Sequence, residues 1–404
     1  MNPLHLSGWG VTISVQDLKS RSWLTVTDGR EDTKQSVTNR FKPRSLPYSS
    51  IVIDGQSGYI SLRALHWLSR NGTPIYVLDV DGSLLSTILP AMPVKADLRV
   101  AQIHAADDPK KKVTIAKALV QAKITRSLQV LDWLSDGYDI ARETRVTRLE
   151  ASKLRRAATV TDLRTVEGRV ALRYWEAFAK VLPEHLEFQG RMTSSHNSNA
   201  SDPVNSAMNY GYALLEGECR RAINAVGLEP SVGFLHELST TQTRQSLTYD
   251  LMEPFRWLID LTVLQAFQSG VLGLDTFHFK FDDYRFRFNP EAKERFIALL
   301  KERFNSGVRY RGERLKWDTV IEEKTSELAR FLTNKMSTVD FAEPSPKLDR
   351  LDDRKLRKRI NSLTSHEAKK RGLGKSTLHY LRRNAHSERP FRVYGKVREK
   401  LLAV

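Results

Sequence analysis

The sequence predicts an α+β protein of several domains: a β-sandwich-like N-terminal domain, an all-α domain after it, and a small helix-turn-helix tail. Three observations support this class. Short runs rich in Val, Ile, Thr and aromatic residues fill the start of the chain, helical periodicity replaces them further on, and basic residues concentrate at the end. We expect the domains to span 1–95, 105–340 and 347–404.

The first domain owes its β-character to short apolar runs separated by Gly, Asn, Asp and Pro, which are turn residues. The expected strands are HLSGWGVTISV, SWLTVTD, SSIVIDG, GYISL, TPIYVLDVDG and LLSTILP. One amphipathic interruption, LRALHWLSRNG, predicts a helix that ends at a glycine after Arg70 and Asn71. A small antiparallel sheet or sandwich is expected here.

The second domain follows a proline-containing hinge, PAMPVKADL. Long helices are expected at KKVTIAKALVQAKITRSLQVLDWL, VEGRVALRYWEAFAKVL and NSAMNYGYALLEGECRRAINAVG, the last with a terminal glycine. The Ser/Asn-rich segment RMTSSHNSNASDP predicts a loop, and FAEPSPKLD predicts a linker to the tail.

The charge of the chain favours a polyanionic partner. The formal net charge is +17 and the pI about 9.8, which favours nucleic acid over an acidic membrane surface. Residues from Ser345 onward carry 18 Lys and Arg against 6 Asp and Glu, a net +12 that leaves +5 for the rest. The single cysteine, Cys219, excludes an intramolecular disulfide and a thiolate zinc site. Without a long apolar run or a signal peptide, we expect a cytoplasmic protein with no membrane partner.

The tail contains a motif that resembles a phosphate-binding loop, GLGKST. A true loop of that kind needs a glycine at position 369, where this chain has Lys369, and a preceding strand. A helix-turn-helix fits better, because Ala368, Gly372, Leu378 and Leu381 have the offsets of its small, turn and core residues. Ser376 or Thr377 would cap the second helix.

The second helix of this motif would present a basic face to double-stranded DNA. The residues expected on that face are Lys375, His379, Arg382 and Arg383. A solvated basic hairpin that only aids solubility is the alternative.

A possible catalytic cluster lies in YDLMEPFR, where Asp250 and Glu253 are three residues apart and would be neighbours on a helix. The flanking sequence is apolar and aromatic, which places both carboxylates beside the core. Pro254 predicts that the helix starts or kinks at this point. His236, after an apolar segment, can project into a cleft. The alternatives are a solvated acidic face and a structural histidine.

Electrostatics favours a bound cation between these carboxylates. Two carboxylates about 4 Å apart repel by roughly 4 kcal/mol at an effective dielectric constant of 20, so a convergent pair requires a cation, a shared proton or an arginine. Oxygen ligands suit Mg²⁺ or Mn²⁺, and one imidazole favours Mn²⁺. HELST is not a zinc-protease motif, and the serine-hydrolase and EF-hand patterns are absent from the sequence.

Several longer segments resemble the CRISPR-associated protein 1 family, the integrases and endonucleases that insert new spacers into CRISPR arrays. The resemblance covers roughly residues 1–300. It rests on IDGQSGYISLRALHWL, DVDGSLL, TVEGRVALRYWEAF, NYGYALLEGECRRAINAVGLEPSVGFLHE and SLTYDLMEPFRWLID. Family members have an N-terminal β-domain and a helical catalytic domain.

The resemblance implies a metal site of Glu167, His236 and an acid of the YDLMEP motif, with Glu253 matching the usual third ligand and Asp250 its neighbour. Glu167 comes from the resemblance alone. All four residues are thereby candidates for catalysis. The choice between Asp250 and Glu253 stays open, because the loop between His236 and Asp250 is longer than is usual in the family.

Further residues near these motifs are candidates for supporting roles. Arg256 is expected to clamp a DNA phosphate or to hold Asp250, and Tyr249, Tyr174 and Asn209 to pack against DNA or order the ligands.

The mechanism implied is transesterification, in which the 3′-hydroxyl of an incoming DNA attacks a target phosphate while Mg²⁺ or Mn²⁺ acts as a Lewis acid. With water as the nucleophile the outcome is nicking. The family also implies a homodimer formed through the β-domain, and a heterohexamer with CRISPR-associated protein 2.

Two other functions remain open on the sequence. A casposase-like transposon integrase would share the chemistry, and a helix-turn-helix tail also occurs in casposases, so the tail does not decide between the two functions. A non-catalytic helix-turn-helix DNA-binding protein, with structural acids, is the alternative from another class.

Overall fold

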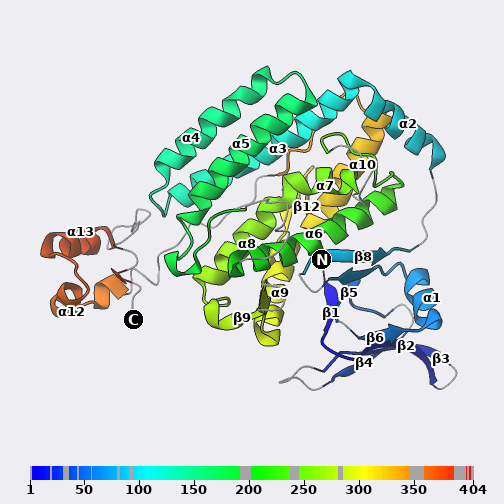
Figure 1. Ribbon diagram of the computed structural model, residues 1–404, viewed down its shortest axis with the longest axis horizontal. Coiled ribbons are helices and arrows are strands. Elements are labelled where there is room, and N and C mark those ends of the chain that lie inside the picture. The colour runs from blue at the N-terminus through cyan, green and yellow to red at the C-terminus, as the bar shows by residue number, and fades with distance from the viewer. Residues whose placement is uncertain are drawn as a thin grey trace.

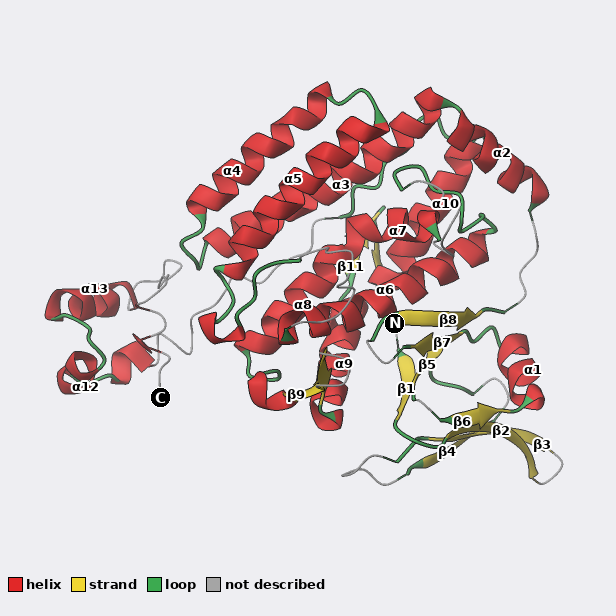
Figure 2. Cartoon of the chain, viewed as in Figure 1, coloured by secondary structure: helices red, strands yellow, loops and turns green. Residues whose placement is uncertain are grey.

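The computed structural model describes residues 2–18, 21–30, 36–42, 45–55, 57–79, 82–90, 95–191, 202–236, 245–280, 285–344 and 359–385, with 397, 400 and 401. The predicted Ser/Asn-rich loop, the linker beyond Pro344 and the loop after His236 lie largely outside these ranges. The fold is the expected α+β architecture, a β-sheet region followed by a largely helical region (Figures 1 and 2).

The N-terminal region contains two four-stranded sheets. The first has the order β1-β5-β7-β8 and the second β4-β3-β2-β6. Their bounds are β1 Pro3–Ser7, β2 Val11–Leu18, β3 Arg21–Thr27, β4 Thr38–Phe41, β5 Ser50–Asp54, β6 Gly58–Ile60, β7 Ile75–Leu78 and β8 Leu84–Ile88. Alternate apolar residues form a core between them, including Leu6, Ile13, Leu24, Val26 and Ile51.

The predicted antiparallel pairing was wrong for part of this region. β1 pairs with β5, β5 with β7 and β2 with β6 in parallel, because longer connections, one of them containing helix α1 (Leu62–Arg70), return the chain to the same edge. Strand β4 was missed, since its residues TNRF are mostly exposed and lack an apolar pattern. Helix α1 ends at Asn71 and Gly72, as predicted, with φ +67° at the glycine.

The helical region begins at Ala96, inside the predicted hinge, whose last three residues are already helical. Its helices are α2 Ala96–Asp107, α3 Pro109–Ser135, α4 Ala141–Ser152, α5 Val160–Ala179, α6 Pro203–Val226, α7 Ser246–Met252, α8 Arg256–Gln268, α9 Pro290–Asn305 and α10 Trp317–Leu332. Short 3₁₀ turns lie at η1 Lys153–Arg156, η2 Glu184–Leu186, η3 Glu253–Phe255 and η4 Leu274–Thr276. No helix of the described ranges is both long and apolar enough to cross a bilayer.

The expectation of an all-α second domain was wrong in detail. Two small hairpins interrupt it, β9 Phe277–Lys280 with β10 Arg285–Phe288 and β11 Val308–Tyr310 with β12 Glu313–Leu315. In the first hairpin aromatic residues alternate along both strands, as in Phe286 and Phe288, and Phe288 packs against Phe277 and Phe296. The pattern was too short to separate from a buried helix segment.

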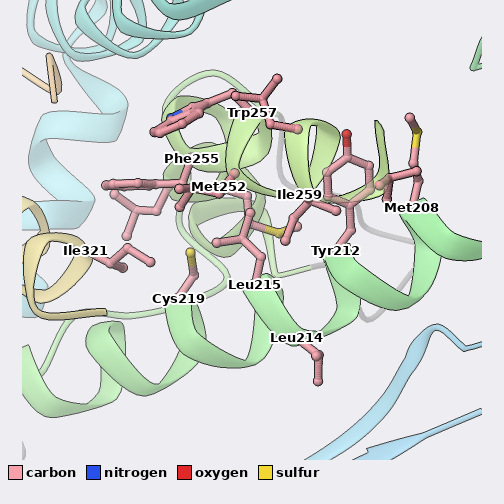
Figure 3. Packing of buried hydrophobic residues seen from close by; sticks show 14 of the residues in the cluster. Met208, Tyr212, Leu214, Leu215, Cys219, Met252, Phe255, Trp257, Ile259 and Ile321 are labelled. Atoms are coloured by element: carbon pink, nitrogen blue, oxygen red, sulfur yellow. The ribbon is translucent and has the colours of Figure 1, made fainter. Parts of the chain in front are cut away.

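Helix α6 is the central helix of this region, because apolar residues surround it on every side. Figure 3 shows its side chains facing those of the α7–α8 segment, with Leu215 and Cys219 beside Met252 and Phe255. Two glycines let neighbours approach closely: Gly211 lies against Ile259 of α8, and Gly217 lies against the ring of Tyr76 of β7. Residues of the first sheet therefore join the helical core.

The tail forms a third packed unit with helices α12 Ser365–Lys370 and α13 Lys375–Ala385. Ala368, Leu378 and Leu381 are buried in its own core, and Gly372 has φ +67°. The identity of the tail as a DNA-binding helix-turn-helix stays a prediction. The second helix begins at Lys375 rather than at Ser376 or Thr377, so neither hydroxyl lies at the residue before the helix.

We predict opposite stability effects for two helical glycines. A Cβ added at Gly211 would lie 2.4 Å from Ile259 Cγ2, so Gly211→Ala should lower the free energy of unfolding by about 1–3 kcal/mol. A Cβ at Gly168 of α5 meets nothing within 4 Å, so Gly168→Ala should raise it by about 0.5–1 kcal/mol. Urea denaturation measures both, and equal effects would contradict this packing.

Candidate active site

A cavity of about 220 Å³ lies among helices α3, α5, α6 and α8 in the helical region. Charged and aromatic side chains line it, including Lys123, Glu167, Tyr174, Trp175, Arg191, Tyr212, Glu253, Arg256 and Asp260. Two of the four predicted catalytic residues, Glu167 and Glu253, therefore share one cavity.

Glu167 lies on α5, a helix whose start is fixed by a capping box. The Thr159 side chain accepts from the backbone N–H of Asp162, and the Asp162 carboxylate accepts from that of Thr159. Two turns further along, Glu167 reaches Lys123 of α3 and makes an ion pair with it. Its side chain is 22% exposed, so it borders the solvent side of the cavity.

Glu253 lies in the 3₁₀ turn η3, where Pro254 interrupts the regular hydrogen bonding between α7 and α8. This is the kink that the sequence predicted. The carboxylate is only 5% exposed and lies between two cations: its Oε1 accepts from Arg256 Nε at 3.0 Å and its Oε2 pairs with Lys123. Burial opposes ionisation, but Arg256, Lys123 and His236 together lower the pKa of Glu253 well below its usual range.

Asp250 is fully buried and has a different task from Glu253. Its Oδ2 accepts from the backbone N–H groups of Phe234 and Leu235 at 2.6 and 3.0 Å, and its Oδ1 from that of His236 at 3.0 Å. The His236 ring Nδ1 lies 2.7 Å from the same Oδ1. Gly233 allows this approach, because a Cβ there would lie 2.9 Å from Oδ2.

The consequence of this arrangement is a fixed imidazole. A carboxylate on Nδ1 places the ring proton there and leaves Nε2 as the nitrogen for a ligand. Both oxygens of Asp250 accept from backbone N–H groups, whereas the oxygens of Glu253 face the side-chain cations Arg256 and Lys123. Arg256, which the sequence paired with Asp250 as one option, instead holds Glu253 and stacks on Tyr212 at 4.8 Å.

Three charged residues that line the cavity were not predicted from the sequence: Asp260, Arg191 and Lys123. Asp260, on α8 beyond the YDLMEP motif, accepts from Tyr174 Oη at 2.9 Å and Tyr212 Oη at 2.5 Å. Burial raises its pKa to about 6 despite these hydrogen bonds. Arg191 donates to Asn209 Oδ1 at 3.0 Å and lies over Tyr212.

Lys123 is the third unpredicted residue. Burial acts to lower its pKa, but the charges of Glu253 and Glu167 outweigh burial and raise it, so Lys123 is a cation here. Nothing in its local sequence, AKITRS, distinguishes it from other helical lysines; only helix packing brings it to the carboxylates.

The carboxylate oxygens of this cavity are the kind of ligand that a hard divalent cation prefers. In the described residues, no three His, Cys, Asp or Glu side chains converge tightly enough to hold an ion. The donors nevertheless fit Mg²⁺ or Mn²⁺: Glu167 and Glu253 share one cation already, and Glu253 Oε2 makes no hydrogen bond of good geometry with any described residue.

The chain matches the family model described as CRISPR associated protein Cas1 over residues 19–302. It belongs to the Cas1 family. A CRISPR-associated endonuclease Cas1 of Archaeoglobus fulgidus is 29% identical over 328 residues, 77% of this chain and 93% of that protein. The sequence-based recognition is thus confirmed.

Two solved structures extend the comparison. A casposase bound to integration product is 34% identical with a TM-score of 0.79, and the match covers 90% of this chain and 99% of that one. A Cas6-RT-Cas1–Cas2 complex shares the fold at 19% identity and a TM-score of 0.68, covering 86% of this chain and 37% of that one.

The remaining predicted residues of this Cas1-family chain lie apart from the cavity. Tyr249 packs edge-on against His236 at 6.3 Å between ring centroids. In the tail, Lys375, His379 and Arg383 are exposed. Arg382 is half-buried and donates to the Leu363 carbonyl at 2.6 Å, so it ties α13 to the residues before α12.

Asp250 and Glu167 should respond differently to loss of charge. Asp250→Asn replaces one of the two acceptor oxygens with an NH2 group, leaves at least one buried backbone N–H without an acceptor, and should lower the free energy of unfolding by about 1–3 kcal/mol. Glu167→Gln, at the solvent side, should change it by less than about 1 kcal/mol. Chemical denaturation of both variants measures this, and an Asp250→Asn protein as stable as the parent would contradict the positioning role.

Proposed function

We propose that this chain is a metal-dependent DNA integrase and endonuclease that joins a DNA 3′-hydroxyl to a target strand by transesterification. The observation that carries the proposal is the pairing of Glu167 and Glu253, from separate elements, around one cation in a cavity lined with arginines. Glu167, Glu253 and His236 Nε2 would hold Mg²⁺ or Mn²⁺. When bound, the ion supplies Lewis-acid activation of the scissile phosphate.

The protein's own groups would position the DNA. Arg191 and Arg256, stacked on Tyr212 in the cavity, offer guanidinium groups for phosphate oxygens. Asp250 keeps the His236 proton on Nδ1. The incoming 3′-oxygen forms a bond to phosphorus as the bond to the leaving 3′-oxygen breaks, and the proton of the attacking hydroxyl leaves to solvent. Water in place of the hydroxyl yields a nick.

Two substrates are consistent with this chemistry. The sequence pointed first to spacers inserted into a CRISPR array, in keeping with the Cas1 endonuclease relatives. The similarity to a casposase bound to integration product favours transposon ends instead. That match covers 90% of this chain, whereas the family model ends at residue 302.

The partners follow from the substrate. Double-stranded DNA is common to both functions, and the basic tail, with Lys375, His379 and Arg383 exposed, would bind further phosphates of the duplex. A homodimer through the β-domain and a heterohexamer with CRISPR-associated protein 2 belong to spacer insertion. A solved complex of the same fold contains Cas2.

An integration assay tests the proposal. Protein, Mn²⁺, a supercoiled plasmid and a short duplex with 3′-hydroxyl ends should give joined products, and Glu167→Ala or His236→Ala should abolish them because a ligand is lost. A matched duplex with 3′-dideoxy ends should give no joining but retain nicking. If the DNA is unchanged in every condition, the enzyme function is ruled out and the non-catalytic DNA-binding protein becomes the favoured function.

Comparing duplexes with different end sequences distinguishes the two proposed substrates. We expect duplexes ending in terminal inverted repeats that flank the gene to be joined faster than duplexes of random sequence if the transposon function holds. Dependence of joining on added CRISPR-associated protein 2, and preference for a repeat array as target, would instead establish spacer insertion.

The tail is predicted to contribute DNA affinity. Truncation after Pro344 removes a net +12 and should weaken duplex binding, and the slope of log K against log salt should fall by about 0.9 for each phosphate that the tail neutralises. Fluorescence anisotropy at several salt concentrations measures this. As a point test, Arg383→Ala should weaken binding, and an unchanged affinity in both variants would show that the tail does not bind DNA.

A further inference from the structure

Lys123 lies between the two carboxylates that would ligate a metal. It comes from α3, Glu167 from α5 and Glu253 from η3, so three separate elements meet at its ammonium group. The lysine side chain is 19% exposed, and both ion pairs form at the border of the cavity. Packing of α3 against α5 and η3, rather than local sequence, fixes this position.

The two cations at Glu253 are not equivalent. Arg256, three residues after Glu253 in the chain, donates to Oε1 at 3.0 Å. Its guanidinium group is also held by stacking on the ring of Tyr212. Lys123 pairs with Oε2 and donates a hydrogen bond to Glu167 Oε1, but its ammonium group ends a flexible four-carbon stem and no aromatic ring of the described residues holds it in the cavity. Lys123 is therefore the cation that can leave while Arg256 stays.

A divalent ion and this ammonium cannot occupy the same space between Glu167 and Glu253, and their like charges repel. We propose that Lys123 is an internal counter-ion that holds the metal position in the metal-free protein and must withdraw when the ion binds. The proposal rests on the proposed function for the identity of the ligands. It assigns to Lys123 a direct competition with the metal.

The displaced lysine has an alternative partner in the substrate. Lys123 lines the same cavity as Arg191 and Arg256, where a DNA phosphate would lie. Transfer of the ammonium group from carboxylates to phosphate would open the metal position as DNA arrives. Binding of DNA and of metal would then favour one another, by the same factor in each direction.

Mn²⁺ titration of the full chain, followed by electron paramagnetic resonance of free Mn²⁺, tests this competition. Lys123→Met should bind Mn²⁺ at least tenfold more tightly than the parent without DNA. Lys111→Met, an exposed lysine on the same helix, should match the parent. A Lys123→Met protein with equal or weaker Mn²⁺ affinity would overturn the proposal.

The linkage to DNA has its own measurement on the unaltered chain. A duplex with 3′-dideoxy ends should raise Mn²⁺ affinity at least tenfold in the parent and by a clearly smaller factor in Lys123→Met, because phosphates can also ligate the ion directly. Equal factors in both proteins would overturn the transfer of Lys123 to DNA.

Further controls distinguish a folding defect in Lys123→Met from an error in the proposed metal site. Lys123→Met leaves two carboxylates without their shared cation, so we expect its melting temperature to be low without metal and to rise with Mn²⁺ more than that of the parent. A variant that Mn²⁺ does not restore counts against the competition. If the parent, Lys123→Met and Glu167→Gln all lack Mn²⁺ binding even with DNA, the proposed metal site is wrong as well.

Discussion

The site depends on the charge balance between two carboxylates that the fold holds close together. Glu167 and Glu253 come from separate elements yet share the ammonium of Lys123. Two carboxylates about 4 Å apart repel by roughly 4 kcal/mol at a dielectric constant of 20, and a cation between them relieves that repulsion. The positions of α3, α5 and the η3 turn all serve this convergence, and the neighbouring arginines set the charge of the cavity.

The three buried acids Asp250, Glu253 and Asp260 differ in their surroundings more than in their residue type. Asp250 accepts three backbone hydrogen bonds and fixes an imidazole, whereas Glu253, three residues away, faces cations. Asp260 is held by two tyrosine hydroxyls, and burial raises its pKa to about 6. The three carboxylates thus differ in the groups they meet: backbone N–H groups at Asp250, side-chain cations at Glu253 and phenol hydroxyls at Asp260.

The fold and part of the site were predictable from local patterns. Helix periodicity and terminal glycines located α1 and α6, and Pro254 marked the kink at η3. Motif resemblance supplied Glu167. Parallel pairing of β1 with β5, the exposed strand β4 and the two short hairpins depend on non-local packing that a local pattern does not encode. Lys123 and Asp260 were missed for the same reason, since their partners lie 44 and 48 or more residues away.

A crystal structure of the full chain with Mn²⁺, with the ion located by anomalous scattering, would show whether the two glutamates exchange their lysine for a metal. We expect one strong anomalous peak bounded by Glu167, Glu253 and His236 Nε2, with Asp250 still bonded to His236 Nδ1 and the Lys123 ammonium withdrawn from both glutamates. A peak at other residues, or no peak at these three ligands with Lys123 unmoved at saturating Mn²⁺, would contradict this exchange.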